Sequence, residues 1–444
     1  MKQSSDIVLE RLLASHSRKL DLSLGRLERL LAQIGNPHHR LPPVIHVGGT
    51  NGKGSTVAFM RAILEASGLA VHVHTSPHLV RFHERIRLGR KGARGELVGE
   101  EELVEALERC ERVNAIANDE ISFFEITIGA TFLLFARHPA DVTLLEVGLG
   151  GRGDATNVVR TPLATVITPI GLDHQEWLGN SLAAIAREKA GIFKRGAPAI
   201  IAPQDYPEAE SVLRREAERS ASKLVLGRED FHVREENGRL VFEDEDGLLD
   251  LPQPRLPGRH QHVNAATAIA ALRTIKVGRL DTKHFEQGMI SVEWPARLQR
   301  LARGRLVELA PPGAELWLDG GHNPDGGRVL AMAVGDLEHQ SPRPLVMIAA
   351  MLSTKDTLGF LRPFQGLVSE LIAVPMEKSS AGRPPREVVS CAREVGLKGV
   401  ESSNLEVALA NLAARDWIVA PRILFAGSLY FAGEVLSANG TVPK

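Results

Sequence analysis

A glycine-rich segment with one lysine and several hydroxyl residues is the strongest candidate for chemistry in this sequence. It runs His46-Val47-Gly48-Gly49-Thr50-Asn51-Gly52-Lys53-Gly54-Ser55-Thr56, between an apolar β-rich run and a helical pattern. Glycines let backbone N–H groups curl around phosphate oxygens, and a helix N-terminus adds a favourable dipole. Lys53 can reach the terminal phosphates of a nucleotide, and the Ser55 hydroxyl can ligate Mg²⁺. The alternative is a glycine-rich turn with a solvent-exposed lysine.

The segment departs from the usual G-x-x-x-x-G-K-[ST] phosphate loop at two positions. Val47 stands where the first glycine belongs, and Gly54 is inserted between Lys53 and Ser55. The flanking runs nevertheless match the strand–loop–helix context that such a loop requires. We therefore interpret the loop as a nucleotide-phosphate site made of Gly49, Thr50, Asn51, Gly52, Lys53, Gly54, Ser55 and Thr56.

Acidic and histidine side chains follow two other β-rich runs at the points where these runs end. Glu146 lies at the end of the apolar run 142–147, and Asp173 and His174 follow the run 164–168. Ligands of open α/β sheets bind at the carboxyl ends of strands, where a carboxylate near a phosphate loop is a good Mg²⁺ ligand. Glu146 could equally form an ion pair with Arg152, and His174 could be a hydrogen-bonded loop residue.

Other candidates cannot be assigned from their local context alone. Lys189, in Arg187-Glu188-Lys189-Ala190-Gly191, would by itself be one charge on a solvated helix face. Asp319 and His322 lie three residues apart in a glycine-rich loop after an apolar run, which suits contacts to a substrate or nucleotide. Gly-Gly and Asn-Pro steps also favour turns, so this loop could equally be a turn and capping device.

Short β-rich runs alternate with helical patterns over the first half of the chain. The β-rich runs are 43–49, 71–75, 142–147, 164–168 and 199–202, and the helical patterns include 55–67, 103–116 and 125–136. Strands that alternate with helices indicate βαβ units and a mainly parallel sheet. Residues 223–251 differ, because charged strand-like segments flank the turn signals Asn237-Gly238 and Asp246-Gly247. We expect a small antiparallel appendage there, followed by a helix over 264–275.

A second alternating series begins after Trp294-Pro295, because proline disfavours a helical conformation in the residue before it. We expect strands at 305–309, 315–318, 345–350, 371–375 and 422–425, separated by helices. The sequence therefore predicts a larger α/β domain over residues 1–293 and a smaller, Rossmann-like α/β domain over residues 294–444.

The composition narrows the classes of partner. Lys and Arg total 53 against 54 for Asp and Glu, a balance that gives no overall attraction to nucleic acid or anionic membranes. Cys110 and Cys391 are far apart and suggest no disulfide framework, and the N-terminal residues lack a continuous apolar signal segment. We therefore expect a cytoplasmic protein with no nucleic-acid or membrane partner. We also expect small-molecule substrates and a monomer, although the composition itself does not give the oligomeric state.

Taken together, the motifs resemble the folylpolyglutamate synthase family, which belongs to the Mur ligase superfamily and is often bifunctional as dihydrofolate synthase in bacteria. The resemblance runs from about residue 20 to residue 434, and its motifs occur in the same order. Gly54, inserted before Ser55, is itself typical of the superfamily's phosphate loop. The other motifs that carry the resemblance are 75–80, 122–125, 146–157, 171–174, 187–194, 260–265, 294–297 and 319–324.

The resemblance implies an ATP site on a P-loop central domain of the Mur ligase type. Lys53 and the loop glycines would hold the phosphates, and Asn264 and Arg297 would contact the nucleotide, Arg297 from the linker between the domains. Asp319, a further nucleotide contact, and His322 would complete the site from the C-terminal domain. The catalytic candidates are Lys53, His174, Lys189, Asp319 and His322.

Two Mg²⁺ ions are implied in the same way. Ser55 and Glu146 would hold one ion, and His174 and Lys189 would help to hold the other. Lys189 is often carbamylated in this family, and a carbamate turns a cationic side chain into an anionic oxygen ligand.

The resemblance also implies where the substrates bind. Ser122, Asp154 and Ala155 match positions that contact the pterin of dihydropteroate in bifunctional relatives, and His322 and Ser428 would lie near the glutamate. Gly153 stands where relatives often carry leucine, which removes a side chain beside the pterin site.

The implied activity is ATP-dependent ligation of L-glutamate to dihydropteroate and to tetrahydrofolates through an acyl phosphate. One alternative is a monofunctional folylpolyglutamate synthase, and another, from a different class, is a P-loop regulatory NTPase. A third is a Mur ligase acting on a UDP-linked precursor. That enzyme usually carries a UDP-binding domain before its phosphate loop, whereas only about 40 residues precede the loop here.

Overall fold

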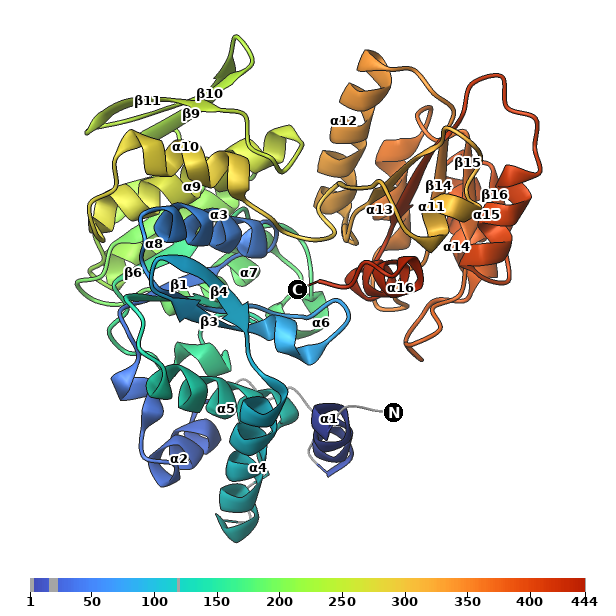
Figure 1. The fold of residues 1–444 in the computed structure, drawn as a ribbon. Helices are drawn as coiled ribbons and strands as arrows, with labels where there is room; N and C mark the ends of the chain where they lie inside the picture. Colours follow the sequence, from blue (N-terminus) through green and yellow to red (C-terminus); the bar gives the residue numbers. More distant parts are fainter. Residues whose placement is uncertain (1–3, 16–22, 118–119, 444) are drawn as a thin grey trace. The chain divides into compact units, whose positions relative to one another are not determined.

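The computed structural model describes residues 4–15, 23–117 and 120–443, which form two compact units (Figure 1). The first unit contains the chain up to Arg255 together with His262–Glu293. The second contains Leu256–Gln261 and Trp294–Pro443. Residues 256–261, which include the first turn of helix α9 (Arg259–Ile275), therefore belong to the second unit although the rest of α9 belongs to the first.

The first unit is built around an eight-stranded sheet in the order β4-β3-β2-β5-β1-β6-β7-β8. Strands β2, β5, β1, β6, β7 and β8 run parallel, and β3 and β4 extend one edge as antiparallel strands. The central strands are buried along their whole length, which explains their near-continuous apolar sequences. This confirms the mainly parallel sheet. The strands are β1 (Val44–Gly48), β2 (Val71–His74), β3 (Ile86–Arg90), β4 (Ala93–Leu97), β5 (Val142–Glu146), β6 (Ala164–Ile167), β7 (Ala199–Ile201) and β8 (Leu224–Leu226).

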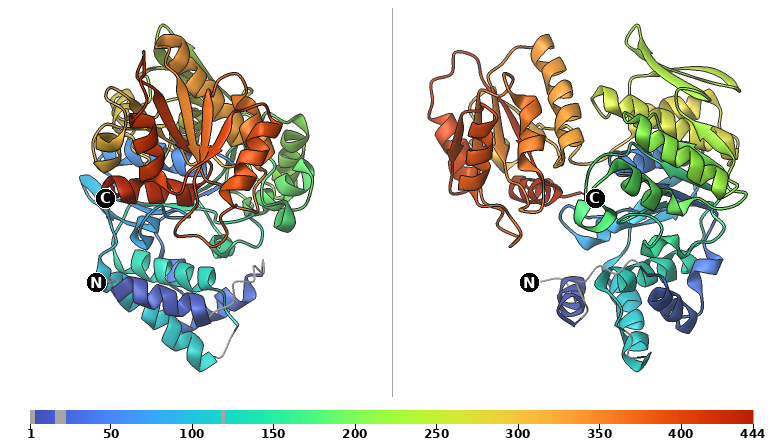
Figure 2. Two further views of the ribbon diagram at one scale, coloured as in Figure 1. Left: turned by 90° about the vertical axis from the view of Figure 1, so that its right-hand side faces the viewer. Right: turned by 180° about the vertical axis from the view of Figure 1, so that it is seen from behind.

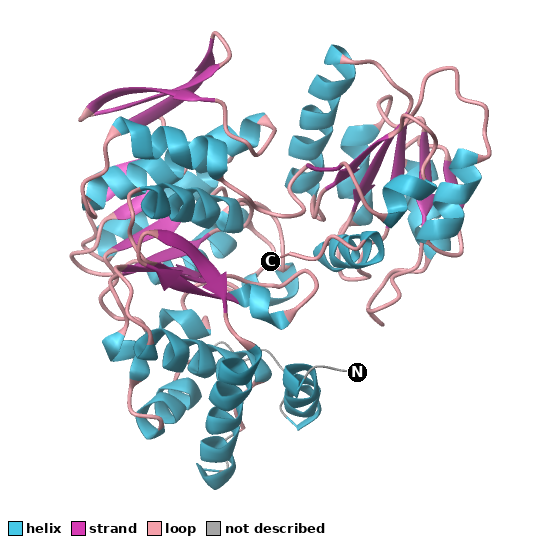
Figure 3. Ribbon diagram, in the orientation of Figure 1, coloured by secondary structure: helices cyan, strands magenta, loops and turns pink. Residues whose placement is uncertain are grey.

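Helices cover both faces of this sheet (Figures 1 to 3). Helices α1 (Ser4–Ser15), α2 (Gly25–Gln33), α4 (Glu100–Ala117) and α5 (Phe123–Arg137) share one apolar core with the strands. Helices α3 (Lys53–Ala66) and α10 (Thr282–Ser291) pack against each other with α9 on the other side. Helices α7 (Leu182–Lys189) and α8 (Pro207–Arg219) form a further core over β6 and β7. No helix within the described ranges is long and apolar enough to cross a membrane.

A three-stranded antiparallel sheet extends from the first unit. Its strands are β9 (Phe231–Glu236), β10 (Arg239–Asp244) and β11 (Gly247–Pro252), in the order β11-β10-β9. The turns between them fall at Asn237-Gly238 and at the residues before Gly247. The antiparallel appendage expected from these turn signals is therefore confirmed.

The second unit has a six-stranded sheet in the order β12-β13-β17-β14-β15-β16, in which β12 alone is antiparallel to its neighbour. Figure 3 shows helices on both sides of it. The strands are β12 (Gln299–Leu301), β13 (Glu315–Leu318), β14 (Leu345–Ala349), β15 (Glu370–Ala373), β16 (Gly399–Glu401) and β17 (Arg422–Ala426). The helices are α11 (Arg305–Leu309), α12 (Pro324–Gln340), α13 (Thr357–Leu361), α14 (Pro385–Glu394), α15 (Leu405–Ala413) and α16 (Leu429–Asn439).

One expected strand is wrong, because residues 305–309 form the short helix α11. The backbone N–H of Leu306 donates to the Asn439 side chain (3.0 Å), and Leu306 is buried. This contact satisfies one of the N–H groups that the first turn of a helix leaves without a partner. Asn439 lies more than a hundred residues further along the chain, so the local apolar run alone could not reveal the cap.

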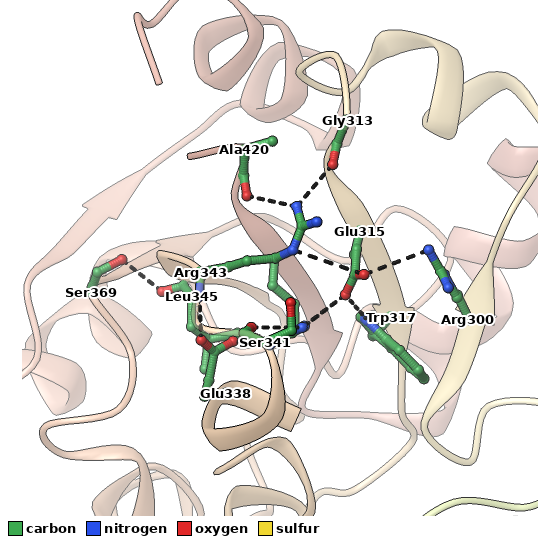
Figure 4. A network of polar contacts seen from close by, with 11 residues as sticks. Arg300, Gly313, Glu315, Trp317, Glu338, Ser341, Arg343, Leu345, Ser369 and Ala420 are labelled. Carbon is green, nitrogen blue, oxygen red and sulfur yellow. Dashed lines mark hydrogen bonds and ion pairs between the residues drawn. The ribbon is translucent and has the colours of Figure 1, made fainter. Parts of the chain in front are cut away.

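An ionic network around the buried Arg422 lies at the end of the second sheet where strands β13 and β17 begin (Figure 4). Arg422, at the start of β17, is 2% exposed and contacts the carboxylates of Glu315 (Nε–Oε2 3.0 Å) and Glu338. Arg343 adds hydrogen bonds to the Gly313 and Ala420 carbonyls, both 3.0 Å. Arg422 and Glu315 begin their strands, so the network lies at the opposite edge from the loops that follow β13 and β17. Its role is structural.

Candidate functional site

The glycine-rich loop joins β1 to α3, as the strand–loop–helix reading requires. The backbone N–H groups of Thr50 and Asn51 both donate to the Pro169 carbonyl (3.1 and 3.2 Å), and Thr168 N donates to the Gly48 carbonyl (2.9 Å). The loop that follows β6 therefore fixes the path of the phosphate loop. Both loops lie at the carboxyl edge of the parallel sheet, where ligands of such sheets bind.

At two positions of the loop, neighbouring side chains lie so close to the backbone that only glycine fits. A Cβ atom on Gly49, at φ +136°, would lie 1.9 Å from Thr168 Oγ1. A Cβ atom on Gly52, at φ +91°, would lie 2.3 Å from the Asn264 side-chain oxygen. The loop is thus packed directly against Asn264 of α9, a predicted nucleotide contact, and only glycine fits at these points.

Two lysines converge on one carbonyl of this loop. Lys53 Nζ donates to the carbonyls of Gly49 (3.1 Å) and Thr50 (3.2 Å), and Lys189 Nζ donates to Gly49 O (2.9 Å). Lys189 is only 5% exposed, so the reading of a charge on a solvated helix face is wrong. Burial, together with the nearby charge of Lys53, lowers the pKa of Lys189 to about 7. A lysine with this pKa carries a substantial fraction of neutral, nucleophilic amine near neutral pH.

Glu146 ends β5 beside the phosphate-loop strand, in register with Val47. It is 5% exposed, and its Oε2 accepts a hydrogen bond from the backbone N–H of Ser76 (3.1 Å). The ion pairs of Arg152 are with Glu188 and Glu216, at 4.0 Å each, which removes the pairing considered for Glu146. Ser76, placed here by the loop after β2, is a site candidate that sequence reasoning missed.

The residues near the loop fit a magnesium ion. Ser55 Oγ is buried and, among the described residues, has no hydrogen-bond partner, as expected of a hydroxyl that awaits a ligand. His174 is on the loop after β6 at φ +52°, with its side chain 43% exposed. The described ranges contain no cluster of three or more His, Cys, Asp or Glu side chains suited to a metal. Hydroxyl oxygens such as Ser55 Oγ are also suited to Mg²⁺, and a carbamate on Lys189 would add an anionic oxygen.

The predicted pterin-site residues meet at two adjacent segments of the first unit. Ser122 is the N-cap of α5, where its Oγ accepts from Glu125 N (3.3 Å) and its own N–H donates to the Glu125 carboxylate (2.7 Å). Phe124, in the first turn of α5, packs against Gly148 so closely that a Cβ there would lie 2.5 Å from its ring. The segment that contains Ser122 therefore abuts the loop after β5.

Asp154 and Ala155 belong to that loop, residues 148–157, which we call the acceptor loop. Asp154 is 2% exposed and is the N-cap of the short helix η3 (Ala155–Val158). Its carboxylate accepts hydrogen bonds from Thr156 N (3.0 Å), Thr156 Oγ1 (2.5 Å) and Leu149 N (2.8 Å). Burial raises the pKa of Asp154, while these hydrogen bonds oppose the rise.

In the second unit, the loops after β13 and β17 lie together. Asp319 is 6% exposed and accepts from the backbone N–H groups of Leu298 (2.7 Å) and Gly321 (2.7 Å). Burial raises its pKa and the nearby Arg297 charge opposes this. The His322 ring nitrogen Nδ1 lies 2.9 Å from Gly320 O.

Ser428 is brought to the same place. The N–H of Gly427 donates to the Gly321 carbonyl (3.0 Å), and Ser428 is the N-cap of α16. The loops after β13 and β17 therefore bring Ser428 to the same edge of this unit's sheet as Asp319 and His322, and Arg297 lies beside them, although Arg297 and Ser428 are 131 residues apart in the sequence.

Comparison with known proteins gives a consistent result. Residues 47–272 match the Mur ligase middle domain. The chain is 33% identical over 423 residues to the folylpolyglutamate synthase of Lacticaseibacillus casei, covering 92% of each chain. It is 36% identical over 365 residues to the dihydrofolate synthase/folylpolyglutamate synthase of Bacillus subtilis, covering 78% of each. The structure of Escherichia coli FolC in complex with DHPP and ADP is similar at a TM-score of 0.84 and 30% identity, covering 98% of each chain.

The fold and the modified phosphate loop are those of a Mur-type ligase, an ATP-dependent enzyme. Within this class, the chain belongs to the folylpolyglutamate synthase family.

Proposed function

We propose that the chain joins L-glutamate to dihydropteroate, which makes dihydrofolate, and also to tetrahydrofolates. The observation that carries the proposal is the placement of the phosphate loop, Glu146 and the acceptor loop at one edge of a single sheet. The names of the similar proteins support it, because the Bacillus subtilis relative carries both activities in its name. A similar structure, that of a bifunctional folylpolyglutamate synthase/dihydrofolate synthase with Mn, AMPPNP and L-glutamate bound, supports the nucleotide, metal and amino-acid parts of the assignment.

ATP and magnesium are the proposed cofactors, with two ions. Ser55 and Glu146 would hold one ion, and His174 and carbamylated Lys189 the other. Bound Mg²⁺ would supply charge stabilisation to the phosphates of ATP. Lys53, freed from its contacts with the loop carbonyls, would provide a further positive charge for the same phosphates.

The chemistry follows from the weakness of a carboxylate as an acyl donor, since its leaving group would be oxide. Transfer of the γ-phosphoryl group of ATP to a carboxylate oxygen of the acceptor gives an acyl phosphate and ADP. The amine of L-glutamate then attacks the acyl carbon, and the tetrahedral intermediate loses phosphate and a proton to leave an amide. The contribution of the protein is positioning, electrostatic stabilisation and exclusion of water from the acyl phosphate.

Each of the two predicted domains has a proposed share in this reaction. The domain formed by residues 1–293 would bind the ATP phosphates, aided by Asn264, and would hold the pterin through Ser122, Asp154 and Ala155. The domain formed by residues 294–444 would contact the nucleotide through Arg297 and Asp319, and the glutamate through His322 and Ser428. We further propose a cytoplasmic monomer without nucleic-acid or membrane partners.

One experiment tests the proposal against its alternatives. ADP release is measured with dihydropteroate, tetrahydrofolate and a UDP-muramyl acceptor, each with and without L-glutamate. We expect glutamate-dependent ADP release with both pteridines. Release with tetrahydrofolate alone would leave a monofunctional synthase, and release with the UDP-linked acceptor would identify a cell-wall ligase. ADP release that needs neither acceptor nor glutamate would indicate a regulatory NTPase.

A further inference from the structure

Two contacts join three buried side chains beneath the acceptor loop, those of Asp154, Thr156 and His46. Thr156 Oγ1 lies 2.5 Å from Asp154 Oδ1 and 2.8 Å from His46 Nε2. His46 and Thr156 are fully buried, and Asp154 is 2% exposed. The contacts connect β1, which leads into the phosphate loop, with the loop that contains the proposed pterin-binding residues.

The donor and acceptor of each contact among these three side chains can be assigned. Asp154 accepts from the backbone N–H groups of Leu149 and Thr156, and these contacts favour the ionised carboxylate against the rise in pKa that burial causes. The single proton of the Thr156 hydroxyl is therefore donated to Asp154. It follows that His46 carries its proton on Nε2 and donates it to Thr156, because a hydroxyl has one proton to give.

The buried imidazole of His46 lowers the stability of the fold relative to an apolar side chain of similar size. Burial lowers its pKa to about 3, so the ring is neutral. Its Nδ1 atom is buried and finds no hydrogen-bond partner in the part of the chain that the structure describes. An unpaired buried nitrogen is destabilising, and an apolar side chain of similar size would avoid it. What the imidazole adds is its one hydrogen bond to Thr156.

The residue that makes this bond is rigidly held. His46 is in the middle of β1, paired with Leu145 of β5 on one side and with Thr165 of β6 on the other. Because β1 lies in the interior of an eight-stranded sheet, the position of His46 is fixed. Its hydrogen bond to Thr156 therefore fixes the position of the acceptor loop.

We propose that His46 and Thr156 are positioning residues for the pterin end of the acceptor, which they serve by fixing the Asp154 carboxylate and the acceptor loop. The inference rests on the proposed function, in which Asp154 and Ala155 line the pterin site. Neither residue needs to touch substrate. Substitutions that disturb this loop geometry are therefore expected to weaken binding of the acceptor and to leave the affinity for ATP unchanged.

The test is a comparison of KM values, because KM does not depend on the fraction of correctly folded enzyme. Thr156→Val removes the hydroxyl with little change in shape, and we expect the acceptor KM to rise about tenfold, which corresponds to one charge-assisted hydrogen bond. The KM for ATP should stay within about twofold. Thr156→Ser keeps the hydroxyl and should restore the acceptor KM. His46→Leu should raise the acceptor KM about threefold without lowering the urea midpoint.

Thr143→Val is the matched control. Thr143 is a buried threonine of β5 whose Oγ1 lacks a hydrogen-bond partner within the described ranges, so the same change of chemistry removes no bond. Its two KM values should equal those of the wild type.

An unchanged acceptor KM in an active Thr156→Val enzyme would overturn this inference alone. Equal rises in the acceptor and ATP KM values would also overturn it, since they indicate general damage. A wild-type protein that ligates glutamate to neither dihydropteroate nor tetrahydrofolate would overturn the proposed function, and this inference with it. If only tetrahydrofolate is a substrate, its KM is the value compared.

Discussion

Replacing Lys189 with methionine should make the ligand-free protein more stable while abolishing its ligase activity. Methionine keeps an unbranched side chain in the buried site and removes the ammonium group. Lys189 is 5% exposed, and its pKa is lowered from 10.5 to about 7 by burial and by the charge of Lys53. The same burial that prepares the amine for carbamylation therefore destabilises the protein whenever the amine is protonated.

The size of the expected gain in the free energy of unfolding follows from the lowered pKa of Lys189. At pH 6 the protonated Lys189 lowers the free energy of unfolding by about 5 kcal/mol, because one pKa unit corresponds to about 1.4 kcal/mol. Between pH 7 and 10.5 the unfolded chain binds more protons than the folded one, so stability rises with pH. From pH 6 to pH 9 this rise is about 2–3 kcal/mol. Loss of the hydrogen bond to Gly49 O, worth about 1 kcal/mol, limits the gain in Lys189→Met to about 4 kcal/mol at pH 6.

The assay is urea unfolding at pH 6 and pH 9 in buffer free of CO₂, so that Lys189 remains a free amine. Lys194→Met is the control, because Lys194 is only half-buried and its ammonium keeps a hydrogen bond to Asn157 Oδ1 (2.7 Å). The free energy of unfolding of this control should rise between pH 6 and pH 9 nearly as much as that of the wild type. The rise in Lys189→Met should be smaller by the part due to Lys189. A Lys189→Met protein with the full wild-type rise would refute the reasoning.

The remaining predictions concern activity, the second sheet and the acceptor loop. Lys53→Ala should abolish ADP formation without lowering the urea midpoint, and near-normal turnover would contradict the phosphate-loop assignment. Lys189→Ala should lose activity, and short carboxylic acids should restore part of it. Mass analysis under bicarbonate should find a carbamate on Lys189 of the wild type. An active enzyme with only free lysine at this position would rule out the carbamate. Arg422→Ala removes the buried guanidinium that pairs with the half-buried carboxylates of Glu315 and Glu338 and should lower the stability of the second unit by about 3 kcal/mol in urea unfolding. A variant as stable as the wild type would show the network to be unimportant. Asp154→Ala should suppress turnover with dihydropteroate far more than it lowers the melting temperature, and the reverse pattern would assign Asp154 a purely capping role.

The sequence was sufficient to predict the parts of the fold that leave a local signal. Apolar β-rich runs predicted β1, β5 and β6, and the turn Asn237-Gly238 predicted the appendage. The antiparallel strands β3 and β4 were not anticipated, because their polar residues give no continuous apolar run. Residues 305–309 were misread because the cap of α11 comes from Asn439, a tertiary contact.

The candidate site was only partly predictable for the same reason. The spacing of glycines around Lys53 indicated a phosphate loop directly. Lys189 looked solvent-exposed, since its burial depends on how α7 packs against β6 and β7. Ser76 was not singled out as a site residue because its proximity to Glu146 arises from the pairing of β2 with β5. The partnership of His46 with Thr156 spans 110 residues and has no local signature.

The central claim is that ATP activates the acceptor as an acyl phosphate, and transfer of an oxygen isotope tests it most directly. The reaction is run with dihydropteroate labelled with ¹⁸O in its carboxylate, together with ATP and L-glutamate, and the phosphate released is analysed by mass. The account predicts that each phosphate formed carries one ¹⁸O atom from the acceptor, because the carboxylate oxygen leaves with the phosphoryl group. Amide formation that yields unlabelled phosphate would contradict the account.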